Sequence, residues 1–421
     1  MKILWAKSGD LLPLDAGGKI RSFNIATELA RRHEVDLFIF YPTTTPDPHL
    51  DLRDPFGRVE CMPLRLHERA SFRDMLAYSA NALTSQPYQI RKDCPPQVLR
   101  RLRQVLHEGH YDALLCDFLL TAAVVPWDVG VPTVIFTHNV EAVIWHRRFL
   151  VNPNPLWKLV AWREYRAIAR AERKFTDMAD HVLTVSEEDR RAFVKFLPEE
   201  KVTTVPTGVD LDYFRPAERS PNSPTLVFTG SMDWLPNEDA IIYFSTEILP
   251  LIQKRIPNVT LCVVGRRPTR KVLALAGKNT SVQVTGGVDD IRPYVHKAAV
   301  YVVPLRIGGG TRIKIFEAMA MGSAIVSTSV GAEGLPVEHG KNILLADSPE
   351  DFAERTIALL TQRAERERIG RAARALVESR YGWAEVTNVL EQILVQVAKT
   401  KCTGKFMSNV RPFNETITPS P

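Results

Sequence analysis

Residues Leu305–Gly322 read LRIGGGTRIKIFEAMAMG, a glycine-rich turn followed at once by a helical pattern. Three consecutive glycines allow backbone N–H groups to approach an anion closely. The first turn of a helix leaves N–H groups without partners, and the helix dipole favours negative charge there. Arg312 and Lys314 add full positive charge, and Glu317 is placed to accept hydrogen bonds from sugar hydroxyls. The segment predicts a site for a phosphate attached to a ribose, with a solvated turn before an amphipathic helix as the alternative.

The length and composition of the chain indicate two ordinary globular domains. A chain of 421 residues suggests two domains at roughly 100–200 residues each, and 45% hydrophobic with 24% charged residues provides for two full cores. The five cysteines are scattered and include no C-x-x-C pair, so we predict neither a disulfide framework nor a zinc site. We find no signal-peptide pattern and no charge-free apolar window of about 20 residues, which favours a cytoplasmic protein.

Positive charge is concentrated in the second half of the chain. The net charge is +6, with 28 basic and 27 acidic residues through Asp210 and with 26 basic and 21 acidic residues beyond it. This excess in the second half suits anionic ligands. The basic clusters interleaved with exposed aromatic residues that nucleic-acid binding requires are not evident, so we predict no nucleic-acid partner.

Strand-like apolar runs alternate with helical patterns in two successive blocks. This alternation predicts an α/β fold with a parallel sheet covered on both faces in each block. The first block contains the expected strands Lys2–Ala6, Glu34–Tyr41, Ala113–Asp117, Pro132–Phe136 and His181–Val185, and the expected helices Gly18–Arg32 and Pro96–His107. The second block contains the expected strands Thr225–Thr229, Val259–Val264, Val282–Val284, Val300–Val303 and Ala324–Ser327, and the expected helices Glu238–Gln253, Ile291–Ala298 and Arg312–Met321.

A segment rich in proline and aspartate separates the two blocks. We assign the first domain to residues 1–205, a linker to 206–224 and the second domain to 225–380. Residues 381–398 include a further helical pattern over Trp383–Val397. Residues 399–421 show no periodicity and are expected to be disordered.

Glycine and polar residues follow several of the expected strands. In open α/β sheets, ligands collect at the carboxyl ends of the strands. The residues at such positions are Gly17, Gly18, His138, Gly230 and Ser231. Their functional interpretation is a close backbone approach to an anion or a sugar, together with a histidine hydrogen-bonded to a substrate hydroxyl. The structural alternative is loops that lead into helices, and a histidine that satisfies loop carbonyls.

Arg147–Lys174 is a strongly basic segment with apolar residues among its charges. It holds eight basic residues against Glu164 and Glu172, and Trp157 and Trp162 lie between them. Such a mixture can bind anionic lipid or an anionic acceptor. A solvated helix face with tryptophans in the core is the structural alternative. Peripheral contact with the inner face of a membrane is therefore one expectation for this segment.

Several spans match one protein family in the same chain order. They are the Gly-Gly loop after the first strand, THN at 137–139, VSEED at 185–189, VPTGVDLDYF at 205–214, FTGSMDWLPNEDA at 228–240, VVG at 263–265, VPLRIGGGTRIKIFEAMAMG at 303–322 and VSTSVGAEGL at 326–335. Together they resemble the family-4 glycosyltransferases (glycosyl transferases group 1), which are retaining enzymes of the GT-B fold. The resemblance covers about residues 1–398 and is more specific in the second domain.

The resemblance implies two Rossmann-like, doubly wound domains that face each other across a cleft. The N-terminal domain would bind the acceptor and the C-terminal domain the nucleotide-sugar. Residues 381–398 would form a helix that crosses back to the N-terminal domain. No metal or other cofactor is implied, because backbone N–H groups and basic side chains would neutralise the diphosphate.

The family pattern also implies roles for individual residues. Glu317 matches the glutamate that holds the nucleotide ribose, and His138 matches the histidine that contacts the donor sugar. Gly17 and Gly18 match the loop near the diphosphate, and Glu333 matches a contact with sugar or nucleotide. The remaining donor-binding residues that we predict around the glycine turns are Gly230, Ser231, Gly309, Gly310, Thr311 and Ile313.

The chain departs from the family pattern at three positions. The family's first glutamate falls at Gly309, and its pyrophosphate-gripping Arg and Lys fall at Ser231 and Asn237. We hypothesise that Arg312 and Lys314, on the glycine-rich turn, take over this charge neutralisation. We therefore predict these two residues as catalytic, together with the histidine.

The activity implied by the resemblance is sugar transfer, with retention, from a nucleotide-sugar to a hydroxyl of a saccharide or lipid-linked acceptor. The context would be cell-surface polysaccharide or glycoconjugate biosynthesis. Fixed N–H dipoles and basic side chains would stabilise the leaving diphosphate, which can take the acceptor's proton on the same face. The alternatives are a catalytically degenerate nucleotide-sugar-binding protein of the GT-B fold and a GT-B epimerase.

Overall fold

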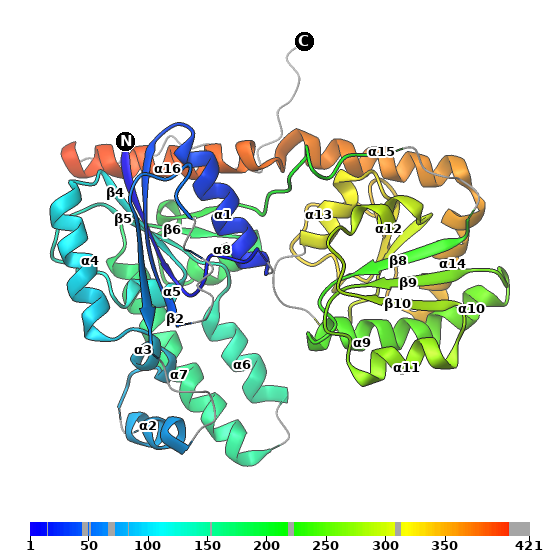
Figure 1. Ribbon diagram of the computed structural model, residues 1–421, viewed down its shortest axis with the longest axis horizontal. Coiled ribbons are helices and arrows are strands. Elements are labelled where there is room, and N and C mark those ends of the chain that lie inside the picture. Colours follow the sequence, from blue (N-terminus) through cyan, green and yellow to red (C-terminus); the bar gives the residue numbers. More distant parts are fainter. Residues whose placement is uncertain are drawn as a thin grey trace, which may run out of the picture. The chain divides into compact units, whose positions relative to one another are not determined.

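The computed structural model describes residues 1–14, 16–43, 49, 52–65, 72–82, 84–151, 154–217, 223–307 and 313–403. Within these residues the chain forms two compact units, each built on its own parallel sheet (Figure 1). The first unit contains Met1–Pro206 and the chain from Ala384 onward, and the second unit is Thr207–Trp383.

The sheet of the first unit has the strand order β3-β2-β1-β4-β5-β6-β7. Its described strands are β1 (Lys2–Ser8), β2 (Glu34–Pro42), β3 (Val59–Leu64), β4 (Ala113–Asp117), β5 (Thr133–Phe136), β6 (His181–Thr184) and β7 (Val202–Thr204). Every residue of β4 is buried, as expected where helices cover both faces of a parallel sheet. The strand order reverses between β1 and β4, which is where open α/β sheets place a ligand crevice, and we call the carboxyl ends of these strands and their neighbours the crevice of this unit.

Helices cover both faces of this first sheet (Figure 1). They are α1 (Gly17–Ala30), α2 (Phe72–Ala82), α3 (Tyr88–Asp93), α4 (Pro96–Gly109), α5 (Leu119–Ala122), α6 (Glu141–Val151), α7 (Pro155–Met178), α8 (Glu187–Phe193), the 3₁₀-helix η1 (Glu199–Lys201) and α16 (Trp383–Thr403). The long helix α7 begins after Asn154, whose side-chain oxygen accepts hydrogen bonds from two backbone N–H groups of the first turn. Such an N-cap satisfies donors that the helix itself leaves unpaired.

The final helix α16 packs on the first unit, although it is the last segment of the described chain. Arg32 Nη1 lies 2.5 Å from Glu391 Oε2, and His33 Nε2 lies 2.7 Å from Glu391 Oε1. The apolar face of the helix is buried. The disorder predicted from Lys399 is wrong for the first residues of that range, because the helix continues to Thr403.

The second unit repeats the winding of the first, with the strand order β10-β9-β8-β11-β12-β13. Its described strands are β8 (Thr225–Thr229), β9 (Thr260–Val264), β10 (Val282–Gly286), β11 (Val300–Val303), β12 (Ile325–Ser327) and β13 (Leu344–Leu345). Its described helices are α9 (Leu235–Tyr243), the π-helix η2 (Phe244–Ile248), α10 (Leu249–Gln253), α11 (Arg270–Lys278), α12 (Arg292–Lys297), α13 (Ile313–Ala320), α14 (Pro349–Thr361) and α15 (Arg363–Arg380). The order reverses between β8 and β11, which puts the crevice of this unit at their carboxyl ends.

The predicted fold class is confirmed, since the chain forms two doubly wound, Rossmann-like α/β sheets. The helix predicted over Glu238–Gln253 is divided into α9, η2 and α10. Pro250 at the start of α10 lacks the N–H that a continuous α-helix would use, and a π-turn absorbs the change in spacing.

The described part of the predicted linker is packed against the second unit. The Val209 N–H donates to the Tyr381 carbonyl at 2.7 Å, and Arg374 Nη1 donates to the Phe214 carbonyl at 2.8 Å. This part of the segment is therefore fastened to the end of α15 and is not a free connector.

Candidate functional site

The crevice of the first unit contains a buried ion pair. Lys7 on β1 and Asp117 at the end of β4 are partners in the parallel register. The Lys7 ammonium lies 3.3 Å from Asp117 Oδ2, and the two side chains are 2% and 0% exposed. Trp5 Nε1 donates to the same oxygen at 3.1 Å. A buried charge is costly unless it is paired and hydrogen-bonded, so these contacts favour the ionised carboxylate.

His138, which follows β5, lies on the other side of this carboxylate. Its Nε2 is 2.7 Å from Asp117 Oδ1, and its Nδ1 is 3.3 Å from Nη1 of Arg21 on α1. A guanidinium can only donate, so Nδ1 accepts from Arg21 and Nε2 carries the hydrogen donated to Asp117. The imidazole is therefore neutral, and burial lowers the pKa of His138 to about 4. Both ring nitrogens are engaged with protein groups in this state.

Lys7, Arg21, Asp117 and His138 form what we name the Asp117 cluster. Burial lowers the pKa of Lys7, and it lowers the pKa of Arg21 to about 9. Burial by itself would raise the pKa of Asp117, but the charge of Lys7 and the contact with His138 hold it well below its usual range. The charged state of the whole cluster therefore depends on this one carboxylate.

Phe118 joins the cluster to the Gly17–Gly18 turn. Its ring stacks on His138 with 3.9 Å between centroids and 15° between planes. Phe118 has φ +72°, a left-handed conformation that costs a non-glycine residue about 1–3 kcal/mol and clusters at functional sites. A Cβ at Gly18 would lie 2.9 Å from Phe118 Cζ and 3.5 Å from His138 Nδ1. Glycine therefore lets α1 begin directly beside the histidine.

Two glycines bring the ends of β8 and β9 together in the second unit. The Gly230 N–H donates to the Val264 carbonyl at 3.0 Å, and a Cβ at Gly265 would overlap the carbonyl oxygen of Gly230. A Cβ at Gly230 would lie 2.8 Å from Lys314 Nζ. A larger residue at either position would displace the backbone or the ammonium, which explains why both are glycine.

Lys314 reaches from α13 to the end of β8. Its Nζ donates to Asn237 Oδ1 at 2.7 Å and lies 4.2 Å from the centroid of the Phe228 ring. Asn237 Nδ2 in turn donates to the Ser231 carbonyl at 2.8 Å. The family pattern has a basic residue at the position of Asn237. In this chain, Lys314 brings a positive charge to that position from a different element of the fold.

Arg266 is a cation of this site that the sequence analysis missed. It follows Gly265 after β9, and its Nε lies 3.2 Å from Ser231 Oγ. Its carbonyl accepts from the Met232 N–H at 2.9 Å, which ties its loop to the end of β8. A guanidinium therefore lies beside the second position at which the family pattern has a basic residue. The available signal was the run VVGRR, in which two arginines directly follow a strand and a glycine at the predicted ligand edge.

Glu317 lies one turn into α13, near Lys314. Burial raises the pKa of Glu317 to about 7, and the charge of Lys314 opposes that rise. The carboxyl group is therefore poised to change charge near neutral pH, and in its ionised form it only accepts hydrogen bonds. Ile313, at the start of the same helix, is buried, so its side chain serves the core.

The structure brings the predicted residues together in two sets, one in each unit. The set in the first unit is Gly17, Gly18 and His138, around the end of β5 and the start of α1. The set in the second unit is Gly230, Ser231, Ile313, Lys314 and Glu317, around the end of β8 and the start of α13. Glu333 is exposed in the turn after β12. Gly309, Gly310, Thr311 and Arg312 lie outside the described residues.

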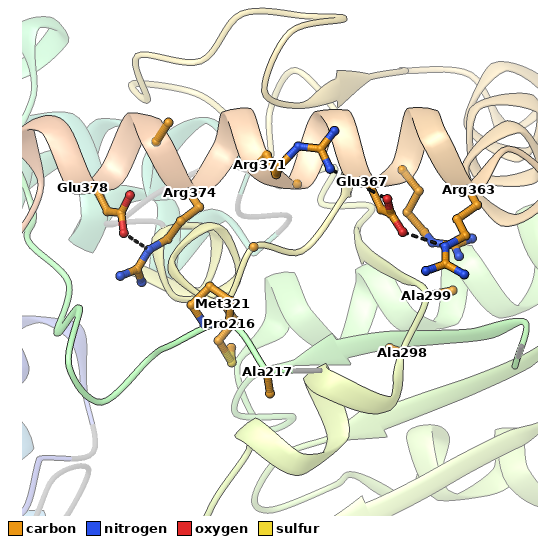
Figure 2. Close-up of a pocket in the computed structure, with 14 residues that line it drawn as sticks. Pro216, Ala217, Ala298, Ala299, Met321, Arg363, Glu367, Arg371, Arg374 and Glu378 are labelled. Carbon is orange, nitrogen blue, oxygen red and sulfur yellow. Dashed lines mark hydrogen bonds and ion pairs between the residues drawn. The ribbon is translucent and has the colours of Figure 1, made fainter. Parts of the chain in front are cut away.

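A separate pocket of about 390 Å³ lies at the opposite edge of the second sheet (Figure 2). Its lining includes Ala298 and Met321, which come shortly before β11 and β12, so it is at the amino ends of these strands. Arginines of α15 complete the lining. Arg374 donates to the Ala320 carbonyl and pairs with Glu378, both at 2.6 Å. The contact with Ala320 fastens α15 to the end of α13, and the pocket is distinct from the predicted site.

Two doubly wound sheets with glycines and cations at their strand ends define an α/β protein of the class whose ligands collect at the carboxyl ends of the strands. Among the described residues, no three or more His, Cys, Asp or Glu side chains are grouped so as to hold a metal ion. Across the same part of the chain, no helix combines the length and apolar character needed to cross a membrane.

The family described as Glycosyltransferase Family 4 matches residues 17–213, and the family described as Glycosyl transferases group 1 matches residues 223–362. One match falls on each sheet, in the order expected for a GT-B enzyme. The chain belongs to this group 1, family 4 set of glycosyltransferases and has their GT-B fold.

Curated relatives are distant. An uncharacterized 44.6 kDa protein in the cps region of Klebsiella pneumoniae is 20% identical over 77% of this chain and 82% of its own length. The GDP-mannose-dependent alpha-(1-6)-phosphatidylinositol monomannoside mannosyltransferase of Mycobacterium tuberculosis is 28% identical over 56% of this chain and 66% of its own length. The chain thus spans slightly less than two thirds of the mannosyltransferase.

Solved structures share the fold over nearly the whole chain. Sucrose-phosphate synthase from Thermosynechococcus elongatus has a TM-score of 0.70 and 18% identity, and the likeness covers 95% of this chain and 100% of that one. Anabaena Alr3699/HepE, in complex with UDP and glucose, has a TM-score of 0.65 and 17% identity, over 94% of this chain and 99% of that one. At such identities the likeness establishes the fold alone.

Proposed function

We propose that this glycosyltransferase moves a sugar, with retention, from a nucleotide-sugar donor to a hydroxyl of a saccharide or lipid-linked acceptor. We extend the proposal to cell-surface polysaccharide or glycoconjugate biosynthesis, which the relative from a cps region supports. The observation that carries the proposal is the Lys314 ammonium at the end of β8, beside Gly230 and 2.7 Å from Asn237 Oδ1.

In this proposal the second unit binds the donor. Lys314 and Arg266 would neutralise the diphosphate, with Arg312 of the glycine-rich turn as a third cation. Glu317 would accept hydrogen bonds from the hydroxyls of the nucleotide ribose. One relative is named for GDP-mannose and one fold neighbour is bound to UDP, so both donor classes belong in the test.

The proposed reaction breaks the bond between the anomeric carbon and the diphosphate oxygen. Cations stabilise the negative charge that grows on the leaving diphosphate while an oxocarbenium-like centre develops. The freed phosphate oxygen takes the proton of the acceptor hydroxyl, which attacks on the same face and so keeps the configuration. This route requires no protein nucleophile and no side chain at Gly309.

His138 would act on the donor sugar through its Nδ1. That nitrogen lies 3.3 Å from Arg21, whereas Nε2 is fixed by Asp117 at 2.7 Å. A sugar hydroxyl could therefore replace Arg21 at Nδ1, where the fixed tautomer requires the hydroxyl to donate. Gly18 places no side chain on this side of the ring, where a Cβ would lie 3.5 Å from Nδ1.

We also propose a cytoplasmic location with peripheral contact at the inner face of the membrane, where a lipid-linked acceptor would be met. Cys61, Cys94, Cys116 and Cys262 are free thiols, which fits a reducing compartment. The basic segment Arg147–Lys174 supports the membrane contact.

The proposal is tested with UDP-, GDP-, ADP- and dTDP-sugars by calorimetric binding and by slow donor hydrolysis, with EDTA present. We expect one nucleotide class to bind, its sugar to be released slowly, and Lys314→Met to weaken that binding. Glycoside formed with a saccharide acceptor would give the stereochemistry by NMR. Failure of every donor to bind, or an inverted product, contradicts the proposal.

A degenerate nucleotide-sugar-binding protein is the second candidate. Gly309 replaces the family's first glutamate, and the basic residues expected at Ser231 and Asn237 are absent from these positions. Tight donor binding without hydrolysis or transfer to any acceptor would favour this candidate. Interconversion of the donor with its epimer would instead identify the epimerase alternative.

A further inference from the structure

Helices α6 and α7 form a hairpin that extends beyond the first sheet, toward the bottom of the view (Figure 1). We name its described end the hairpin tip, made of residues 147–150 of α6 and 155–162 of α7. Large apolar side chains are exposed at this tip. Leu156 is 74% exposed, Trp157 60% and Leu159 61%, and Leu150 and Trp162 are also exposed.

These side chains are not the core face of the helix. The core face of α7 is formed by Ala161, Ala167 and Ile168, which are buried. All five residues from Pro155 through Leu159 are exposed, so the first turn of α7 presents its side chains on every side. The tip is thus an apolar surface with no cover in the described unit, and contiguous surfaces of this kind mark binding sites.

The charge at the tip has one sign. Residues 143–163 include Arg147, Arg148, Lys158 and Arg163 and contain no aspartate or glutamate. Arg147, Arg148 and Lys158 are exposed. Glu164, the next acidic residue, is buried and paired with Arg163. Cations at the rim of an exposed apolar turn match an anionic lipid surface, whose phosphates meet the charges while the apolar side chains enter the headgroup region.

Two contacts arrange basic and aromatic side chains together on this surface. The Lys158 ammonium lies 5.3 Å from the Phe149 ring, and the Arg166 guanidinium lies 5.3 Å from the Trp162 ring. Tryptophan with a neighbouring cation is the combination enriched at membrane–water boundaries, because one part is apolar and the other stays hydrated.

Helix α2 adds a second apolar surface beside the hairpin. Met75 and Leu76 on α2 are exposed. Arg163 of α7 lies 5.9 Å from the Tyr78 ring and donates to the Asn81 carbonyl at 2.7 Å, so α2 is fastened to the hairpin. Figure 1 shows α2 at the same end of the unit as the α6–α7 hairpin.

We propose that the hairpin tip docks on an anionic lipid bilayer, with Leu156, Trp157 and Leu159 entering the interface and Arg147, Arg148 and Lys158 at the lipid phosphates. A second copy of this chain is a poorer occupant, because a two-fold contact would bring the same cations together. This inference rests on the membrane contact in the proposed function and deepens it by naming the side chains that would enter the bilayer and those that would meet its phosphates.

The test uses the full chain and two kinds of vesicle, one of phosphatidylcholine alone and one that also contains about 30 mol% phosphatidylglycerol. Sedimentation of the vesicles measures the bound protein. We expect binding to the anionic vesicles that weakens in high salt and is at least about tenfold weaker to the neutral vesicles. Replacing the three apolar residues by serine (Leu156→Ser, Trp157→Ser and Leu159→Ser together) should weaken binding at least about tenfold. Arg147→Gln, Arg148→Gln and Lys158→Gln together should abolish the preference for anionic lipid.

Leu273→Ser is the matched control for a single Leu159→Ser variant, because Leu273 is also an exposed leucine on a helix. The control should bind vesicles as the parent does, and all variants should keep the parent's thermal unfolding midpoint and donor binding. Absence of vesicle binding, or equal binding by parent and tip variants, overturns the inference. The inference is also overturned if the parent is a dimer, the tip variants are monomers and the parent does not bind vesicles. Failure of the parent protein to bind any donor would count against the proposed function alone.

Discussion

The two crevices of this protein have the same topology but use their charges differently. In the first unit, Lys7 and His138 contact the buried carboxylate of Asp117, which holds them together inside the fold. In the second unit, the ammonium of Lys314 donates to the neutral amide of Asn237 at 2.7 Å, and its charge opposes the raised pKa of Glu317 on the same helix. Similar strand ends can therefore serve either to stabilise a domain or to attract an anion.

The largest effect is expected from breaking the first crevice. Asp117→Asn keeps the shape of the side chain but leaves the cations of the Asp117 cluster without their carboxylate. Removing one partner of a buried ion pair costs about 3–5 kcal/mol of unfolding free energy. Urea unfolding followed by circular dichroism measures this loss.

Asp128→Asn is the control for that change. Asp128 pairs with Arg103 at 2.7 Å, but the side chains are 66% and 40% exposed. Exposed pairs contribute little, so unfolding should be nearly unchanged. Equal sensitivity of the two variants would contradict the structural role of the Asp117 cluster.

The next effect concerns the second crevice. Lys314→Met should weaken donor binding about 10–100-fold, equal to about 1.4–2.7 kcal/mol, while leaving the unfolding midpoint close to that of the parent. Adding Asn237→Lys to this variant should restore part of the affinity, because the cation would return from the neighbouring position. Calorimetry on both variants checks the pair.

Lys271→Met is the matched control, since Lys271 is an exposed lysine that contacts Glu238 at 3.3 Å outside the crevice. It should bind the donor as the parent does. Unchanged affinity in Lys314→Met would show that the charge at the end of β8 has no role in donor binding.

A pH profile of donor binding sharpens the comparison further. The pKa of Glu317 is raised to about 7, so the carboxyl group loses its proton as pH rises from 6 to 8. Since only the ionised group is purely an acceptor for ribose hydroxyls, affinity should rise with pH, by up to about tenfold. Glu317→Gln should remove this dependence.

The first crevice should contribute nothing to that profile. The pKa of His138 is lowered to about 4, so the imidazole is already neutral at pH 6. An affinity that falls between pH 6 and 8, or a profile that persists in Glu317→Gln, would assign the titration to another group.

The smallest of these effects is expected at Arg266. Arg266→Ala should weaken donor binding about 3–10-fold, equal to about 0.7–1.4 kcal/mol, because the guanidinium, whose Nε lies 3.2 Å from Ser231 Oγ, would assist Lys314 at the diphosphate. Arg267→Ala is the neighbouring control. Arg267 is 72% exposed and pairs with Asp233, so its loss should leave affinity unchanged, and equal losses in both variants would deny Arg266 a specific role.

The buried strands and their order of appearance could be predicted from the sequence, because continuous apolar runs are the local signature of a two-sided parallel sheet. The edge strand β10 was also predicted, over Val282–Val284, but the edge strands β3, β7 and β13 were not. β3 reads VECMPL and is mostly half-buried, with a proline inside it, and β13 has only two residues. Helix α15 was missed because its many charges hide the buried seam of Ile369, Ala373 and Val377.

The glycine turns and Lys314 could be found from local sequence, since each lies within a recognisable strand–turn–helix run. The partners of these residues could not, because they depend on tertiary contacts. Lys7 meets Asp117, and Lys314 meets Asn237, across long separations in sequence. Arg266 belongs to the site only because the ends of β8 and β9 are adjacent in the sheet.

Helix α16 gives the chain an unusual order of completion during synthesis. The first unit leaves the ribosome early, but the helix whose buried residues include Val386, Leu390 and Ile393 is made only after the second unit. The second unit can therefore reach its final form while the older one still exposes an apolar seam. A chain whose synthesis ends before Ala384 would therefore lack this helix of its N-terminal unit. Chaperones would bind that unit for as long as its apolar surface remains exposed.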